Sequence, residues 1–146
     1  MISNLSSMAT KTKEISMTLE KTDMPGTGNS RCSVSKEKMI EYNNIEITKS
    51  QVADFLNFLS VNGYEKAKKI NVVLSNRKTV RGWGTANIAK NKVLLYRHSV
   101  WIFLHEISHI ISPPKMVNGR RDVHGSHFGK SLDTLFKQWC EFTQSV

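Results

Sequence analysis

Two histidines and a glutamate form the pattern H-E-x-x-H in the C-terminal half of the chain, as His105, Glu106 and His109. In a helix, residues four apart lie about one turn from each other on the same face, so both imidazoles can reach one divalent metal ion. Glu106 is rotated by about 100° from His105 and can contact a water molecule at that ion rather than the ion itself. A carboxylate placed there can take a proton from the water and pass it to a leaving amine, which is acid–base chemistry suited to amide hydrolysis.

The residues around this motif are strongly apolar. The alternative interpretation is that the two histidines are ordinary polar residues of an amphipathic helix. Apolar residues recur at helical spacing around them, as Val100, Phe103, Leu104, Ile107 and Ile110. Burying unpartnered polar side chains in such a helix costs several kcal/mol, so the pattern favours a metal site.

A catalytic zinc ion needs a third protein ligand and keeps one position open for water. The extended pattern H-E-x-x-H-x-x-G-x-x-H would require Gly and His where this chain has Ser112 and Lys115. A downstream glutamate is a second possibility, but the single one, Glu141, lies near the chain end on a predicted helix with its own core-facing residues. Both of these ligand sets are therefore disfavoured.

Two further histidines, His124 and His127, follow the motif at a shorter distance. We prefer His124 as the third ligand, because it precedes Gly125, which frees the backbone to turn at that point. His127 stays as the alternative.

Capping signals define the helices that must position these residues. Ser99 is a good N-cap for the helix with the motif, and proline at position 113 ends it. Upstream, Thr48 with Gln51 three residues later forms a capping-box pattern, and Gly63 provides the stop for that helix.

Three short runs between these helices predict strands, over residues 70–74, 79–89 and 93–96. Gly82 and Gly84 make the middle strand irregular or bulged. A basic polar loop is expected over 115–123.

A last helix is predicted from about Ser126 onwards. Its buried face is expected to comprise Phe128, Leu132, Leu135, Phe136, Trp139 and Phe142. The order helix, three strands, helix, loop and helix predicts an α+β fold. Residues 1–44 are expected to form a flexible polar segment rich in Ser, Thr, Lys and Asn, and residues 45–146 the folded domain.

Composition excludes several classes of protein. The chain has 146 residues, which suits one domain, and no run approaches the roughly 18 apolar residues of a membrane span. Cys32 and Cys140 cannot form a disulfide framework. Because no apolar core follows the N-terminal charges, we expect no signal peptide and a cytoplasmic location.

The positive charge lies mainly in the expected domain. The net charge is +9, and residues 51–146 hold 14 basic and 6 acidic residues. Such a field suits nucleic acid or another acidic partner, although a solvated basic surface explains it equally well. Trp83 beside Arg81 offers a face for stacking on a base, but a buried hairpin tryptophan is the favoured interpretation.

The two histidine motifs together resemble a known family. The segments 105–109 and 124–128 are similar to the H-E-x-x-H and H-G-x-x-F pair of SprT-like (Spartan-type) zinc metalloproteases and related small zincin metallopeptidases of phages and bacteria. Residues 81–86 and 93–96 resemble the family's Gly-containing strand and the edge strand before its active-site helix. The resemblance covers about residues 70–142 and implies a compact zincin-like core.

The resemblance also implies a site and an activity. It implies Zn²⁺ bound by His105, His109 and His124, with Glu106 as general base and then acid, and a protein or peptide substrate that extends to DNA-associated proteins. The strand at 93–96 would bind an extended peptide by backbone pairing, with a plain core strand as the alternative. Side chains that could help stabilise the oxyanion, but for which a solvated or structural role is favoured, are Tyr96, His98, Arg120 and Arg121.

Two other functions stay open at this stage. One is a catalytically silent module that binds metal or nucleic acid on a peptidase fold, although an intact Glu106 weighs against it. The other is a metallohydrolase acting on an amide that is not a peptide, since the same water chemistry would serve.

Overall fold

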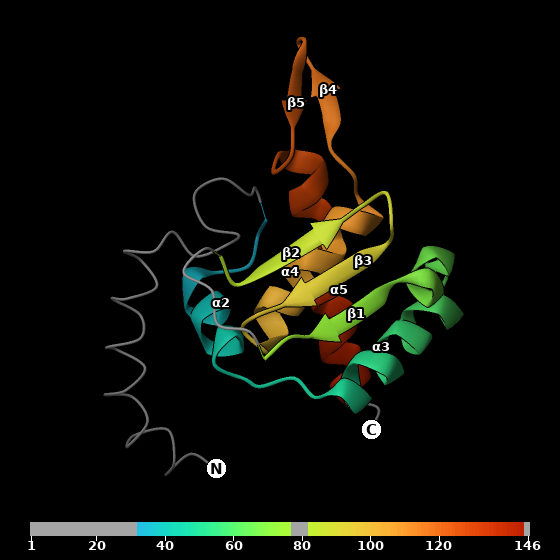
Figure 1. Cartoon of the computed structure of the whole chain (residues 1–146). Helices are drawn as coiled ribbons and strands as arrows, with labels where there is room; N and C mark the ends of the chain where they lie inside the picture. Colours follow the sequence, from blue (N-terminus) through green and yellow to red (C-terminus); the bar gives the residue numbers. More distant parts are fainter. Residues whose placement is uncertain (1–31, 77–81, 145–146) are drawn as a thin grey trace.

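The computed structural model describes residues 32–76 and 82–144, which form a mixed α+β structure (Figure 1). In chain order the elements are α2 (Lys36–Asn43), α3 (Lys49–Val61), the short 3₁₀ helix η1 (Glu65–Lys69), β1 (Asn71–Leu74), β2 (Gly84–Asn87), β3 (Lys92–Leu95), α4 (Val100–Ile111), β4 (Lys115–Val117), β5 (Arg120–Asp122) and α5 (Ser126–Gln144). The predicted α+β class is confirmed. None of the described helices has the length and apolar character needed to cross a membrane.

Strands at the three predicted places form one small sheet with the order β1-β3-β2, but β2 covers only residues 84–87 of the predicted 79–89, of which 79–81 lie outside the described residues. Val93 of β3 pairs with Val72 of β1 in a parallel register and with Ala86 of β2 in an antiparallel register. The prediction that residues 93–96 form the edge strand is therefore wrong. β3 is the central strand, and its Val93 and Leu95 are fully buried, whereas no residue of β1 or β2 is buried. The edge strand that lies against α4 is β2.

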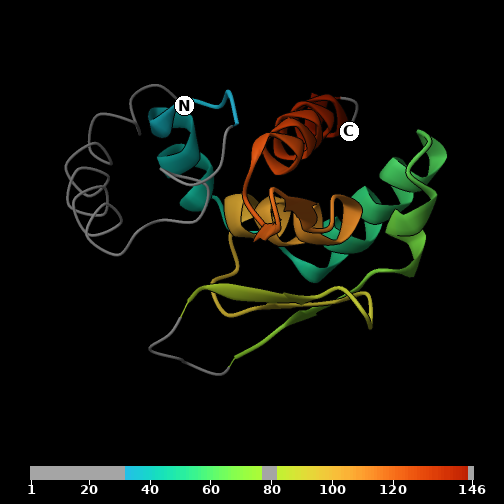
Figure 2. The same ribbon diagram turned by 90° about the horizontal axis from the view of Figure 1, so that it is seen from above.

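Helix α4 lies between the sheet and α5, as seen from above in Figure 2. It is buried continuously from Val100 to Ser108, because the sheet covers one side of it and α5 covers another. The Ser99 hydroxyl accepts a hydrogen bond from the Ile102 N–H, as the predicted N-cap requires. The helix ends at Ile111, just before the proline pair, as predicted.

Helices α3 and α5 complete the core beside α4. The capping box of Thr48 and Gln51 is present, and Gly63 has a φ of 101° just beyond the end of α3. α5 begins at Ser126 as predicted. Of its expected face, five members are buried and Phe136 is half-buried against the core. The rings of α3, α4 and α5 meet at Phe55, which lies 5.0 Å from Trp139 between centroids.

The folded part begins earlier than the predicted boundary at residue 45. Helix α2 precedes that boundary and buries Met39 and Ile40 in the core. The buried Asn43 side chain accepts a hydrogen bond from Ser99 Oγ at 2.8 Å, which ties α2 to the start of α4. The sequence KEKMIEYN has only two adjacent apolar residues, so its helical periodicity is weak. Residues 1–31 of the predicted flexible segment lie outside the described residues.

The predicted loop over 115–123 contains a two-stranded hairpin, β4–β5, which corrects that prediction. Met116 pairs with Arg121, and Asn118 and Gly119 form the turn with φ values of 51° and 77°. Positive φ at both turn residues is the backbone of a type I′ turn, for which Asn-Gly is a preferred sequence. All seven residues from Lys115 to Arg121 are exposed, and Figure 1 shows the hairpin projecting from the rest of the described structure.

Candidate metal centre

The H-E-x-x-H residues lie in the middle of α4, where the helix is buried. His105 is 4% exposed, and His109, one turn later, is half-buried. Their Nε2 atoms lie 3.3 Å apart. The helix thus places both imidazoles on one face, as the spacing predicts.

The third histidine of the cluster comes from the segment between β5 and α5. His124 Nε2 lies 3.1 Å from His109 Nε2, and one nitrogen from each of the three rings falls within 4.8 Å of the others. His127 does not belong to this group, and its carbonyl accepts a hydrogen bond from Ser112 Oγ at 3.3 Å. Glu141 is exposed near the end of α5 and is also outside the group.

Two of the three separations between these nitrogens match those around one small metal ion. With Zn–N bonds of 2.0–2.1 Å, the edge of a zinc tetrahedron is about 3.4 Å, which is close to the two measured contacts. A neutral imidazole has only one N–H group, so three ring nitrogens that converge in this way cannot all be satisfied by hydrogen bonds to one another. The described residues therefore bring together three histidines that can bind a metal ion.

Burial keeps these imidazoles neutral, which is the form that binds metal. Burial, and then the neighbouring histidines, lower the pKa of His105 well below its ordinary value. Burial and the nearby His124 lower the pKa of His109 to about 4. The pKa of His124 is lowered by burial and raised in part by Asp122.

Phe128 holds the three histidine rings in place. Its ring centroid lies 5.0 Å from that of His105, 4.6 Å from His109 and 4.9 Å from His124, and the residue is fully buried. His105 Nδ1 has no hydrogen-bond partner among the described residues, so packing on Phe128 orients this ring. The sequence assigned Phe128 to the core and to the second motif, but its position among the three rings was not predicted.

Glu106 lies beside the cluster, against the edge strand β2. It is 6% exposed, and burial raises its pKa to about 7. A Cβ atom on Gly84 would lie 2.9 Å from Glu106 Cγ and 3.1 Å from Ile102 Cγ2, so a side chain at position 84 would displace the carboxylate or the helix. The glycine that suggested an irregular strand thus allows β2 to approach Glu106.

Gly125 has a similar role beside His124. A Cβ atom there would collide with the carboxylate of Asp122, which lies against the start of α5. A negative charge is favourable at a helix N-terminus. Gly125 therefore allows β5 and α5 to meet closely at the third histidine.

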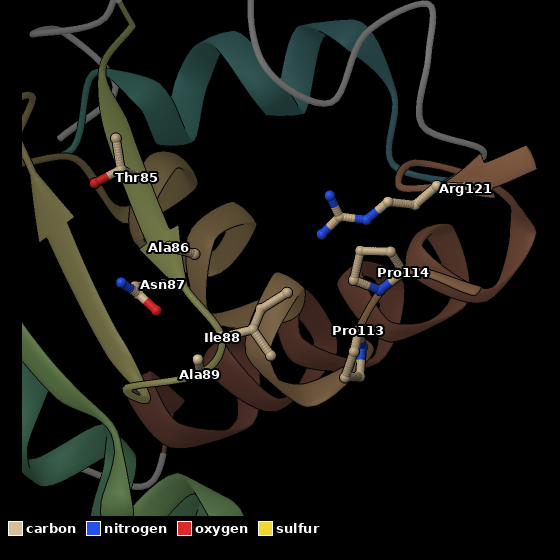
Figure 3. Close-up of a pocket in the computed structure, with 8 residues that line it drawn as sticks. All are labelled: Thr85, Ala86, Asn87, Ile88, Ala89, Pro113, Pro114 and Arg121. Atoms are coloured by element: carbon tan, nitrogen blue, oxygen red, sulfur yellow. The ribbon is translucent and has the colours of Figure 1, made fainter. Parts of the chain in front are cut away.

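Arg121 lies in the lining of two open pockets beside this centre. One, of about 710 Å³, lies between β2 and the segment 113–114, and Figure 3 shows Arg121 pointing into it. The other, of about 570 Å³, includes His124. Arg120 lines neither pocket.

The remaining candidate side chains make contacts within the fold. His98 Nε2 lies 2.8 Å from the carbonyl oxygen of Ser75, and Tyr96 is half-buried. Trp83 is also half-buried, and the Arg97 guanidinium lies 5.6 Å from its ring centroid. Its partner in the base-stacking hypothesis, Arg81, lies outside the described residues.

Comparison with protein families, curated proteins and solved structures finds no match for this chain.

Proposed function

We propose that this chain is a zinc-dependent metallopeptidase with a zincin-like core of the SprT-like type. The observation that carries the proposal is the convergence of three imidazoles beside a buried glutamate, with His124 Nε2 and His105 Nε2 at 3.1 and 3.3 Å from His109 Nε2. A structural metal site would be closed by a fourth protein ligand. Among the described residues no fourth histidine, cysteine or carboxylate joins this cluster, which leaves room for water and substrate.

Zinc is the metal that fits this donor set best, since neutral imidazoles and a small tetrahedral separation suit it. When bound, it would act as a Lewis acid that polarises a carbonyl group and lowers the pKa of a water molecule towards about 7. His105, His109 and His124 would hold it.

Glu106 would move the protons of the reaction. Its carboxylate accepts a proton from the attacking water, whose oxygen forms the new bond to the scissile carbonyl carbon. The same carboxyl group then donates that proton to the departing nitrogen as the C–N bond breaks. One water is consumed, and the products are a free carboxyl group and a free amine.

Strand β2 would bind the peptide in an extended form. In the described residues it pairs with β3 on one side only, so its outer edge offers backbone N–H and C=O groups to a substrate. Gly84 at its start lies against Glu106. A peptide paired with β2 would thus reach the catalytic carboxylate, which assigns to β2 the role first expected for residues 93–96.

The test is to compare the zinc-loaded chain with its Glu106→Gln variant. We expect about one zinc ion per chain in both proteins, measured by elemental analysis, and a loss of peptide cleavage of at least about 100-fold in the variant. A folded wild-type chain that binds no zinc would overturn the proposal. Digestion of a mixed peptide library, read by mass spectrometry, separates a peptidase from a silent metal-binding module and from a hydrolase of other amides.

A further inference from the structure

The pocket along β2 contains one charged side chain. Its wall on the sheet side is formed by residues 85–89, and its opposite wall by Pro113, Pro114 and Arg121. In Figure 3 the Arg121 guanidinium points across Pro114 towards β2. The other lining residues are small, apolar or neutral, so this guanidinium sets the charge of the pocket.

Arg121 has no competing partner in the part of the chain that the structure describes. No hydrogen bond or ion pair to its side chain is present there, and the residue is exposed. The adjacent Asp122 does not neutralise it across the pocket, because the Asp122 carboxylate lies against Gly125 at the start of α5. A guanidinium with free donors favours a carboxylate, which it can bind through two parallel hydrogen bonds.

The pocket extends along β2 in one direction from the catalytic carboxylate. Gly84, at the start of β2, touches Glu106, and the pocket begins at the next residue and continues to Ala89. At about 3.3 Å per residue, a peptide paired with this edge would place residues within about four positions of the scissile bond along the pocket. Arg121 also lines the pocket that contains His124, so it lies between the metal centre and this part of the groove.

We propose that Arg121 makes this centre selective for peptides with an acidic side chain within about four residues of the scissile bond, on one side only. The inference rests on the proposed peptidase function and adds its substrate class. Selectivity comes from the guanidinium pairing with a Glu or Asp carboxylate while the peptide backbone pairs with β2.

The test uses three series of peptides, one for Glu, one for Gln and one for Lys. Within each series, that residue is placed at one position of the peptide at a time. The zinc-loaded full chain digests each series, and mass spectrometry gives the cleavage site and the relative kcat/KM. We expect Glu to be preferred over Gln by about fivefold at positions on one side of the cleavage site, since an exposed ion pair contributes this much at most. The preference should weaken in high salt.

Three variants separate this role from general effects of charge. Arg121→Ala should remove the preference, and Arg121→Glu should shift it to Lys. Arg120→Ala removes the same charge from the same strand at a residue outside the pocket, and it should keep the wild-type ratio. Equal cleavage of the Glu and Gln series by the wild-type chain, or an unchanged ratio in Arg121→Glu, would overturn the inference while leaving the peptidase function intact.

Binding to the Glu106→Gln variant provides a readout without turnover. Fluorescence anisotropy with labelled Glu and Gln peptides should show the same preference, and the double variant with Arg121→Ala should lose it. If no peptide of any series is cleaved by the zinc-loaded wild-type chain, the proposed function itself is wrong, and this inference falls with it.

Discussion

The histidine cluster and the β4–β5 hairpin are adjacent in the sequence, but they differ in how deeply they are buried. His109 and His124 are separated by 15 positions, and the hairpin lies between them. The two helices that bear or flank the histidines are packed into the core, whereas the hairpin is exposed from Lys115 to Arg121. The three histidines are thus positioned by buried packing, while few contacts restrict the side chains of the hairpin beside them.

The largest expected effect comes from removing a ligand of the centre. His109→Ala takes away the nitrogen that lies close to both others, so zinc affinity should fall by at least about a thousandfold, as expected when one of three protein ligands is lost. Competition with a coloured chelator measures this affinity. His127→Ala is the matched control, and it should retain zinc; equal losses in both variants would contradict the assignment of His124 over His127.

The next effect tests the packing that supports the centre. Phe128→Ala should lower the free energy of unfolding by about 3–5 kcal/mol and weaken zinc binding by about tenfold, because the ring contacts all three imidazoles. Leu132→Ala, one turn later and equally buried, should lower stability without changing zinc affinity when measured well below the unfolding temperature. Calorimetric unfolding and zinc titration distinguish the two.

A third prediction concerns the pH dependence of the metal-free chain. The pKa of His109 in the folded state, about 4, lies below its ordinary value of 6.5, so the unfolded chain takes up a proton first as the pH falls. Stability should therefore be fully present above about pH 6.5 and should decrease towards pH 4, by up to about 3 kcal/mol from this residue. Urea unfolding in the presence of a chelator measures it. His109→Asn should flatten the profile, and an unchanged slope in that variant would show that other groups cause it.

The smallest effect is expected in the hairpin. Met116 is 69% exposed, so Met116→Ser should change the free energy of unfolding by no more than about 0.5 kcal/mol and leave zinc affinity unaltered. The same measurements used for Phe128→Ala apply here. A large loss of zinc binding would mean that the hairpin supports the centre, and the contrast between the two regions would be wrong.

The same contrast explains which features the sequence could predict. The motif on α4, the caps at Thr48 and Ser99, and the start of α5 depend on local patterns, and the structure contains each of them. The choice of His124 over His127 also used a local cue, the following Gly125, although in the structure Gly125 has no positive φ and serves instead to admit the Asp122 carboxylate.

The features that were mispredicted depend on pairing between distant segments. The apolar run that forms β3 fits an edge or a centre equally well until its partners are known. Helix α2 is stabilised by tertiary contacts such as Asn43 with Ser99, which its weak periodicity does not reveal. In the hairpin, Asn118–Gly119 is a turn signal, but the strands on either side of it have only three residues each, too few to show a strand pattern.

The hydrogen bond from Ser112 Oγ to the His127 carbonyl oxygen, at 3.3 Å, has a consequence for how such a protein can diversify. It joins the end of α4 to the beginning of α5, so the intervening segment is anchored at both of its ends. Doubling the length of a flexible segment closed in this way costs only about 0.6 kcal/mol of loop entropy. Insertions and substitutions at the hairpin tip can therefore accumulate at little cost in stability while the three imidazoles keep their positions.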